Sequence, residues 1–330
     1  MTADSEKIPD FVRPPRGEKL LRLLHRCVPL GRHFHPLLAA LNPPHGLFAL
    51  PLESAHLLMP AAWRKSAAHL LLVGMDSVPE FRLLPPMLRE LSEGCIVDVG
   101  ANIGLYTVLF HAHSPLPIVS YEPQPFLCQM LRWNAAYNGH DQTRIRNVAC
   151  GAEAGEVLMH AGLNGAVALA HETAAAKIAG RPGETWEQQA ARAQAGYQWE
   201  RVPVVTLDNE LPQLGRVALL KVDCEGYELN ILRGARRLLA QPGLRLFLEI
   251  HPSQLRKFGQ SAAAVVDLLS PDFELEFWSF EQRRPKTKLG RSLARCRRPQ
   301  AHRFASLTDF LAAVDLPDCA SQMYCIGRPR

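Results

Sequence analysis

Short apolar runs alternate with amphipathic segments over much of the chain. Seven runs predict buried strands: residues 95–100, 118–123, 145–151, 217–226, 244–252, 273–280 and 323–328. The segments that follow most of these runs have the spacing of helices. Strands that alternate with helices predict an α/β fold, here a seven-stranded, mostly parallel and doubly wound sheet. Because whole runs are apolar, both faces of that sheet are expected to be covered.

The N-terminal part of the chain does not follow this pattern. Residues 1–85 are rich in proline, histidine and leucine, and proline repeatedly interrupts their helical spacing. We therefore predict an irregular, partly helical extension over residues 1–85 and one domain over residues 86–330. Within the domain, the alanine-rich segment 163–200 and the basic segment 281–303 interrupt the alternation and are predicted to be insertions.

The net charge of +5 is concentrated in the second insertion. Residues 281–303 hold nine Lys or Arg against one Glu, a local charge of +8, so the rest of the chain carries 5 − 8 = −3. Such a run is able to contact an anionic partner, and it is equally typical of a solvated loop. It lacks interleaved aromatic residues, which disfavours a stacking surface for single-stranded nucleic acid.

The cysteines and the first residues bear on the compartment. The eight cysteines include no CxxC pair and have no regular spacing, which favours a reducing environment over a disulfide framework. The first residues lack the apolar core of a signal peptide, and no apolar stretch reaches the roughly 20 residues that span a bilayer. We expect a cytoplasmic protein.

Candidate binding chemistry begins where the first strand ends. The sequence VDVGANIG contains Asp98, Gly100, Asn102 and Gly104, a composition expected to leave backbone N–H groups bare and to let a ligand approach the main chain closely. The G-x-N-x-G spacing differs from the G-x-G-x-x-G of dinucleotide sites, which disfavours an NAD-dependent reductase. That reductase nevertheless remains an alternative.

The next strand ends in an acid. Glu122 lies 22 positions after Gly100, where a carboxylate accepts hydrogen bonds from both hydroxyls of a ribose. A nucleoside is therefore expected. S-adenosylmethionine fits better than a dinucleotide, because it offers a ribose to Glu122, an amino-acid end to the glycine turn and an ammonium group to Asp98.

Five segments together resemble the FkbM-type methyltransferases: VDVGANIGLYT, YEPQP, NVACG, LLKVDCEGYELNILRGA and LEIHP. The resemblance extends over about residues 80–280, with MYCIGR as the closing strand. It implies a Rossmann-like, S-adenosylmethionine-dependent enzyme that methylates a hydroxyl of a carbohydrate, glycolipid or secondary metabolite. The cofactor-binding residues expected on this basis are Asp98, Gly100, Asn102, Gly104, Glu122 and Asn147.

Charged residues at the end of the fourth strand are the candidate catalytic groups. Lys221, Asp223 and Glu225 alternate along the strand, so they are expected to share one face and to reach its carboxyl edge. A bland alternative is that a Lys221–Asp223 or Lys221–Glu225 pair only caps the sheet. The turn lacks the Asn/Asp-Pro-Pro-aromatic sequence of many amino-methylating enzymes, which favours a hydroxyl acceptor.

A hydroxyl acceptor requires a base or a metal ion. We expect Glu225 to be the base, with His251 as the other candidate, although a histidine at the end of a strand often only donates to the backbone. A divalent ion held by Asp223, Glu225 and Glu249 also remains open, but we assign no metal ligand from the sequence. Outside enzymes, the alternative is an S-adenosylmethionine-binding scaffold that acts through the basic run.

One helix carries two large aromatic residues. Trp133 and Tyr137 are four positions apart and so share a helix face, for which packing in the core is the expected role.

Overall fold

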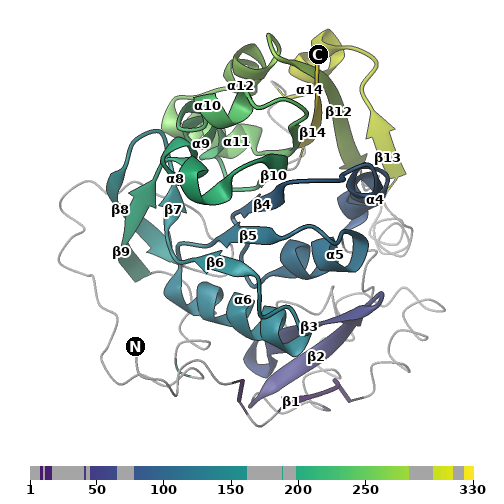
Figure 1. Cartoon of the computed structure of the whole chain (residues 1–330), viewed down its shortest axis with the longest axis vertical. Coiled ribbons are helices and arrows are strands. Elements are labelled where there is room, and N and C mark those ends of the chain that lie inside the picture. Colours follow the sequence, from purple (N-terminus) through teal and green to yellow (C-terminus); the bar gives the residue numbers. More distant parts are fainter. Residues whose placement is uncertain are drawn as a thin grey trace, which may run out of the picture.

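A central eight-stranded sheet organises the molecule (Figure 1). The computed structural model describes residues 8–9, 12–16, 41, 45–64, 78–161, 188, 198–281, 300–314 and 323–330. The strand order is β13-β12-β14-β11-β10-β4-β5-β6. The bounds are β4 Cys95–Val99, β5 Ile118–Tyr121, β6 Arg144–Arg146, β10 Val217–Val222, β11 Arg245–Ile250, β12 Phe273–Glu281, β13 Gln300–Arg303 and β14 Met323–Pro329.

The pairing confirms the predicted α/β sheet. Strands β6, β5, β4, β10 and β11 are parallel, whereas β14 runs antiparallel to both β11 and β12. All seven predicted runs contribute a strand to this sheet. The eighth strand, β13, pairs antiparallel with β12 at the edge, inside the segment predicted as a basic insertion.

Helices cover both faces of the sheet, as the apolar strands predicted. One face packs against α5 (Leu105–His113) and α6 (Pro125–Tyr137). The other face packs against α8 (Leu207–Leu214), α9 (Glu228–Arg233), α10 (Arg236–Leu239), α12 (Ala262–Leu269) and α14 (Leu307–Val314). Successive side chains divide between the faces: Ile96 joins the first core and Val97 the second. Shorter helices are η3 (Ala61–Arg64), η5 (Pro79–Leu83), α4 (Leu84–Arg89), α11 (Pro252–Leu255) and η7 (Arg256–Phe258).

The third predicted strand is divided between two sheets. Residues 144–146 form β6 of the main sheet, but β7 (Ala149–Cys150) pairs with β9 (Gln198–Val205), which also pairs with β8 (Gly155–Ala161). Asn147 lies at the break, where its amide donates to the carbonyl oxygens of Glu122 and Pro123 at 2.9 Å each. Of the predicted insertion 163–200, only residue 188 and the start of β9 lie within the described residues.

Within the described residues, the N-terminal region contains a small sheet that was not predicted, together with the short helices η3 and η5. Strands β1 (Val12–Arg13), β2 (Leu47–Leu52) and β3 (Ala55–Pro60) form the sheet, and the β2–β3 hairpin packs on α5 and α6 (Figure 1). Residues 17–40 of the predicted extension lie outside the described residues. Where the extension ends and the domain begins stays a prediction.

Two asparagines of α6 attach this hairpin to the domain. Asn134 is fully buried, accepts from the N–H of Leu58 at 2.5 Å and donates to its carbonyl oxygen at 3.0 Å, and Asn138 forms the same pair of bonds with His56. The expected core role holds for Trp133, which is buried, but is wrong for Tyr137, which is 40% exposed. The face of α6 that meets β3 carries asparagines because the edge of β3 offers unpaired backbone groups.

None of the helices in the described ranges is long and apolar enough to cross a membrane. Among the described cysteines, those at 95, 128, 150 and 325 are buried free thiols, and Cys224 is half-buried.

Strands β12 and β13 form a hairpin that allows a test of the basic insertion. Glu281 and Gln300 are register partners, so the two described residues that flank residues 282–299 are neighbours in the sheet. We expect replacement of residues 282–299 by Asn-Gly, a two-residue hairpin turn, to change the dissociation constant of S-adenosylhomocysteine by less than about twofold. Calorimetric titration of the full chain and of this variant measures the effect. A loss of binding would place the basic insertion at the cofactor site.

Candidate active site

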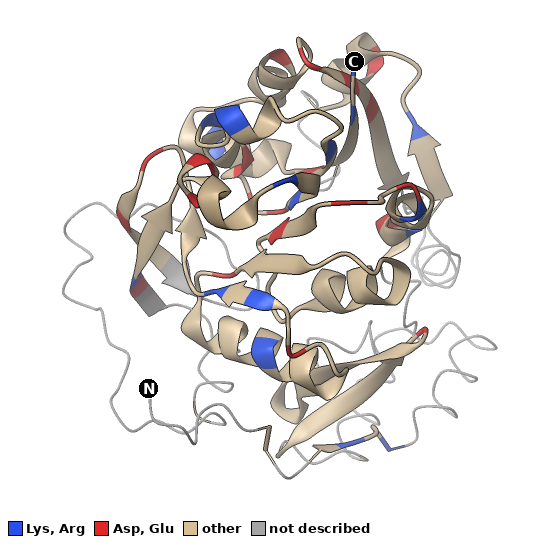
Figure 2. Cartoon of the chain, in the orientation of Figure 1, with Lys and Arg blue, Asp and Glu red and all other residues tan. Residues whose placement is uncertain are grey.

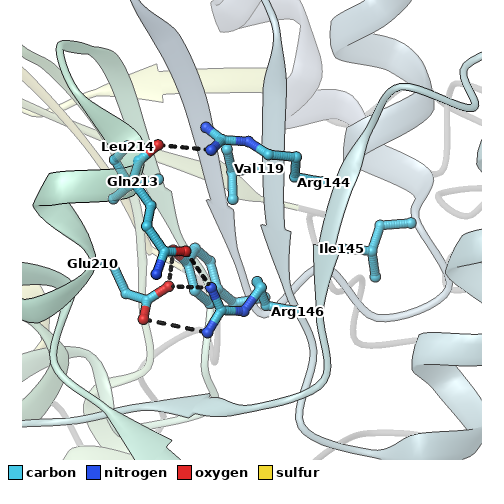
Figure 3. Close-up of a pocket in the computed structure, with 8 residues that line it drawn as sticks. Val119, Arg144, Ile145, Arg146, Glu210, Gln213 and Leu214 are labelled. Carbon is cyan, nitrogen blue, oxygen red and sulfur yellow. Dashed lines mark hydrogen bonds and ion pairs between the residues drawn. The ribbon is translucent and has the colours of Figure 1, made fainter.

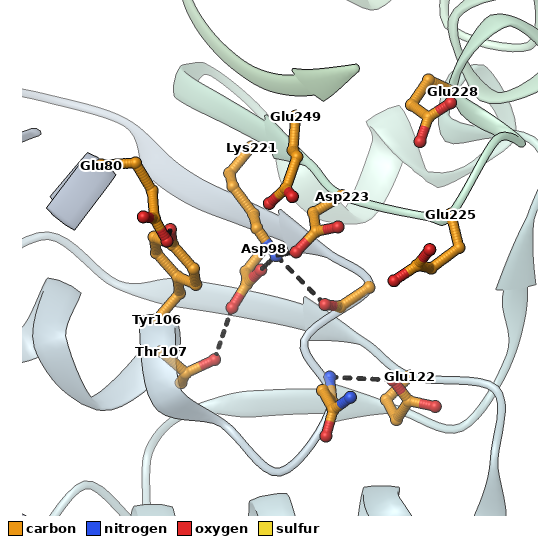
Figure 4. Close-up of polar contacts among 12 residues, drawn as sticks. Glu80, Asp98, Tyr106, Thr107, Glu122, Lys221, Asp223, Glu225, Glu228 and Glu249 are labelled. Carbon is orange, nitrogen blue, oxygen red and sulfur yellow. Dashed lines mark hydrogen bonds and ion pairs between the residues drawn. The ribbon is translucent and has the colours of Figure 1, made fainter. Parts of the chain in front are cut away.

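Acidic side chains from four strands meet at one edge of the sheet. Because β4, β5, β10 and β11 are parallel, their carboxyl ends lie together, and each is followed by or contains an acid near that end: Asp98, Glu122, Asp223 and Glu249. Figure 2 shows acidic residues gathered where β4, β5 and β10 end, and Figure 4 shows the side chains. In open α/β sheets this edge is where ligands bind.

The turn after β4 does not expose the backbone N–H groups that its composition suggested. Gly100 and Ala101 donate to the carbonyl oxygen of Tyr121, and Asn102 donates to the Glu122 carboxylate. Ile103 donates to the side-chain oxygen of Asn102, and the N–H of Gly104 bonds to the carbonyl oxygen of Ala101. The expectation of bare N–H groups is therefore wrong, because the neighbouring strand and the turn itself satisfy all five.

Gly100 is required by the packing of two turns. Its φ is +76°, and a Cβ atom there would lie 2.0 Å from the carbonyl oxygen of Asp223 in the turn after β10. The glycine thus brings the turns after β4 and β10 into contact. Whether Gly100 and Gly104 also contact a cofactor stays a prediction.

Glu122 presents a carboxylate beside the glycine turn. It is 4% exposed, and its two oxygens accept from the N–H groups of Asn102 at 2.8 Å and Gln124 at 2.9 Å (Figure 4). A carboxylate has about four acceptor positions, so each oxygen keeps one for a further donor. Burial raises the pKa of Glu122 to about 7, although both backbone hydrogen bonds favour the charged form. The amide of Asn147 donates to the backbone carbonyl oxygens of Glu122 and Pro123 and so fixes the backbone at this point, and a contact of Asn147 with the cofactor stays a prediction.

Lys221 and Asp98 form a buried ion pair across β10 and β4. The two residues are register partners, their side chains are 1% and 0% exposed, and Lys221 Nζ lies 3.0 Å from Asp98 Oδ1. Thr107 donates to the other oxygen of Asp98, and Lys221 also donates to the carbonyl oxygen of Gly100 at 3.1 Å. Asp98 thus holds Lys221 and is not accessible to an ammonium group of a ligand. Of the pairs considered from the sequence, Lys221–Asp223 is present as a longer contact of 3.7 Å.

The turn after β10 carries Asp223 and Glu225 to the open edge. Regular alternation ends at Val222, and Glu225 (φ +49°) and Gly226 (φ +98°) both adopt left-handed conformations. This turn places the Glu225 carboxylate 3.8 Å from His251 Nε2, with 34% of the side chain exposed. Burial raises the pKa of Glu225.

His251 lies between carboxylates on both sides of its ring. Its Nδ1 is 2.8 Å from Glu228 Oε1, and its Nε2 is 3.2 Å from Glu249 Oε1. Burial alone would lower the pKa of His251, but the hydrogen bonds to Glu228 and Glu249 outweigh burial and raise it to about 11. A raised pKa favours the protonated imidazole at neutral pH and so disfavours His251 as the base, whose role stays a prediction.

Sequence reasoning missed two buried acids at the site, Glu80 and Glu228. Glu80 comes from η5, in the region predicted to be an extension, and accepts from the Tyr106 hydroxyl at 2.9 Å. Burial raises its pKa to about 7. Glu228 is the first residue of α9. It is completely buried and accepts a hydrogen bond from the N–H of Gly226. Glu228 stands inside the quoted segment LLKVDCEGYELNILRGA, whereas Glu80 lies 17 positions before the first quoted segment, in the region predicted to be an extension.

A cavity away from the acidic edge is also present in the described part of the chain. It has a volume of about 280 Å³ and lies between β5, β6 and α8, lined by Arg144 and Arg146 among others (Figure 3). Arg146 forms an ion pair with Glu210 at 2.8 Å, and Arg144 donates to the carbonyl oxygen of Gln213. Since these arginines already bind α8, the cavity belongs to a helix–sheet interface and not to the acidic edge.

Comparison of the chain with models of known protein families identifies its family. A model of the FkbM methyltransferase domain matches residues 98–278, more than half of the chain. The chain belongs to the FkbM methyltransferase family. The match begins at Asp98 and includes every strand from β5 to β11, so it covers the acidic edge, with the exception of Glu80. The fold is the Rossmann-like fold of class I S-adenosylmethionine-dependent methyltransferases.

Solved methyltransferase structures are distant from this member of the FkbM family. The FkbM methyltransferase from Methylobacillus flagellatus KT is 16% identical, with a TM-score of 0.33, over 65% of this chain and 50% of that chain. A precorrin-6y C5,15-methyltransferase from Geobacter metallireducens GS-15 is 11% identical, with a TM-score of 0.35, over 77% and 86%. An S-adenosylmethionine-dependent methyltransferase from Agrobacterium tumefaciens is 8% identical, with a TM-score of 0.45, over 86% and 70%. This chain therefore spans half the length of the M. flagellatus structure. No curated protein matches the chain in sequence.

Proposed function

We propose that this FkbM-family protein transfers a methyl group from S-adenosylmethionine to a hydroxyl of a carbohydrate, glycolipid or secondary metabolite. The observation that carries the proposal is the group of carboxylates, Asp223, Glu225 and Glu249, around His251 at the carboxyl edge. An aliphatic hydroxyl is weakly acidic, so its methylation needs a proton acceptor beside the oxygen. These carboxylates lie next to the glycine turn, which is where the cofactor of this family is expected.

The residues at the turn fit the nucleoside part of the cofactor. Glu122 keeps two acceptor positions, one on each oxygen, and its backbone contacts hold them beside Asn102. Ribose hydroxyls are donors that match this pair. The excess of negative charge along the same edge also suits a ligand that carries a sulfonium and an ammonium group.

Glu225 is the proton acceptor in this proposal. S-adenosylmethionine supplies a methyl group on a sulfonium: the acceptor oxygen forms the new C–O bond, and the C–S bond breaks with its electron pair remaining on sulfur. The hydroxyl proton passes to the carboxylate of Glu225, which is the most exposed acid of the group. Asp223 and Glu249 lie deeper and hold His251, so their role is to keep the edge ordered and negative.

A matched panel of acceptors tests the reaction type. The full chain is incubated with S-adenosylmethionine and with sugars, sugar derivatives and aliphatic alcohols in one set, and with amines of similar size in the other. Formation of S-adenosylhomocysteine with the hydroxyl set, and a methyl ether in the mass spectrum of the product, is the expected result. Turnover with amines only would overturn hydroxyl methylation, and cofactor binding without turnover would favour the scaffold alternative.

The pKa of Glu122 predicts how cofactor affinity depends on pH. Ribose hydroxyls donate to the charged carboxylate, and with a pKa of about 7 that form is a minority species at pH 6. We therefore expect the dissociation constant of S-adenosylhomocysteine to fall by about tenfold between pH 6 and pH 8 and then to level off. Calorimetric titration across this range measures the change.

Glu122→Gln is the matched control for this pH dependence. The amide cannot ionise, so the variant should bind at least tenfold more weakly at pH 8 and should lose most of the dependence. Lys221 and Asp98 are the charges that act on Glu122, and both are retained in the variant. If the variant kept the same pH profile as the parent, the titrating group would lie elsewhere and Glu122 would not be the ribose acceptor.

A further inference from the structure

We propose that Asp223, Glu249 and His251 bind one divalent metal ion at the carboxyl edge. Asp223 follows β10 and Glu249 lies near the end of β11, and these strands are parallel neighbours with Val222 opposite Leu248. One side-chain atom from each of the three residues lies within 4.8 Å of the other two. Ligand atoms that share an ion at about 2.0–2.1 Å are roughly 3–4 Å apart. Small rotations of these side chains are therefore sufficient.

The support behind His251 is a second, independent observation. Its Nδ1 is fixed by Glu228, which is completely buried and is not one of the three ligands, so Nε2 is directed at Asp223 and Glu249. Metal-binding histidines usually donate their other ring N–H to a carboxylate in this way. A histidine that merely ended the strand would not require a buried glutamate on its far side.

The charge balance of the cluster also favours a cation. Five carboxylates gather here: Glu80, Asp223, Glu225, Glu228 and Glu249 (Figure 4). In the described part of the chain, His251 and Lys221 form ion pairs with members of this group, and Lys221 lies closer to Asp98. Buried like charges destabilise one another unless a cation lies between them or one of them takes up a proton, and a bound ion would let all five stay charged.

The donor set indicates the kind of ion. Two carboxylates and one imidazole suit Mn²⁺, Mg²⁺ or Zn²⁺ better than Ca²⁺, which prefers oxygen ligands alone. Binding requires Nε2 of His251 to release its proton. This set differs from the one considered from the sequence, because His251 replaces Glu225, which lies at the mouth of the site.

The ion would have a defined use, and this part rests on the proposed hydroxyl methylation. An acceptor hydroxyl bound to such an ion would be more acidic than in water, and Glu225, whose carboxylate lies 3.8 Å from His251 Nε2, would be placed to take up its proton. The oxygen forms the bond to the methyl carbon as the C–S bond breaks. Metal binding by itself does not depend on which acceptor is used.

Metal binding is tested without acceptor or cofactor. The full chain is freed of metal with EDTA and titrated with Mn²⁺, and free Mn²⁺ is followed by electron paramagnetic resonance. We expect one bound ion per chain, at least tenfold weaker binding in Asp223→Asn and in Glu249→Gln, and about tenfold weaker binding in Glu228→Gln. Glu274→Gln, at an exposed position of β12, is the control and should bind as the parent does.

Two readouts keep this test independent of folding and of the reaction. Mn²⁺ should raise the unfolding temperature of the parent and of Glu274→Gln but not of Asp223→Asn, and each variant's unfolding transition without metal shows that it is folded. Absence of Mn²⁺ binding in the parent, or binding that is unchanged in both Asp223→Asn and Glu249→Gln, would overturn the site. Mn²⁺ binding without turnover of any hydroxyl acceptor would instead refute the proposed function and leave the metal site standing.

Discussion

Lys221→Met should destabilise the protein by about 3–5 kcal/mol, the scale for breaking a buried ion pair on one side. Lys221 is 1% exposed and its ammonium group lies 3.0 Å from Asp98, which is fully buried. Methionine has a similar length, so the main change is the loss of the charge that balances Asp98. Urea unfolding of the chain without cofactor measures the difference in the free energy of unfolding.

Two further variants identify the cause of that loss. Lys257→Met changes an exposed lysine of η7 and should alter stability by less than about 0.5 kcal/mol. The double variant Lys221→Met/Asp98→Asn should lose less stability, by about 0.5–3 kcal/mol, than the sum of the losses in the two single variants. The second change removes the charge of Asp98 that the first change leaves unbalanced. If Lys221→Met unfolded like the parent but lost activity, Lys221 would act in catalysis, as the sequence suggested, and not in holding the sheet edge together.

Glu225→Gln should lower methyl transfer by about 10²-fold or more, the usual scale for loss of a general base, while S-adenosylhomocysteine affinity changes by less than about twofold. Glu225 is the most exposed acid around His251, and its carboxylate lies at the open edge. The amide retains the shape of the side chain and removes its basicity. Turnover with a hydroxyl acceptor from the panel and calorimetric titration of the product nucleoside measure the two effects.

The comparison that decides this assignment uses His251. Because the hydrogen bonds to Glu228 and Glu249 raise the pKa of His251 to about 11, His251→Gln should affect metal binding and stability before it affects proton transfer. Glu274→Gln should leave turnover unchanged. Full activity in Glu225→Gln, together with lost activity and retained Mn²⁺ binding in His251→Gln, would contradict the role proposed for Glu225 and make His251 the base.

Local patterns account for most of the fold that the sequence predicted. The apolar runs specify buried strands whatever surrounds them, and all seven have a place in the central sheet. The prediction for the third run is only partly wrong. Asn147 divides this run into two short strands because its side chain bonds to the backbone of Glu122 and Pro123, 25 and 24 residues earlier in the chain. The β2–β3 hairpin was missed because its support comes from Asn134 and Asn138, about 80 residues further along the chain.

For the candidate site, too, the sequence predicted the position of residues but not their contacts. Position along a strand predicted that Asp98, Glu122, Asp223 and Glu249 reach one edge, because parallel strands align their carboxyl ends. It did not predict the partner of each charge. Lys221 pairs with Asp98 across two strands, the N–H groups of the glycine turn are bound by the neighbouring strand, and Glu80 enters from the N-terminal region.

The sequence by itself determined the family, the alternation of strands and helices, and the edge at which the acids collect, because these depend on residue order and on a periodicity of two or 3.6 residues. Only the tertiary structure decided which acids hold a cation, which remain at the open edge, and how His251 is oriented. Those properties depend on distances of 3–4 Å between side chains from different strands. Spacing along the chain contains no information about such distances, so the roles of Lys221, Asp98 and His251 had to come from the fold.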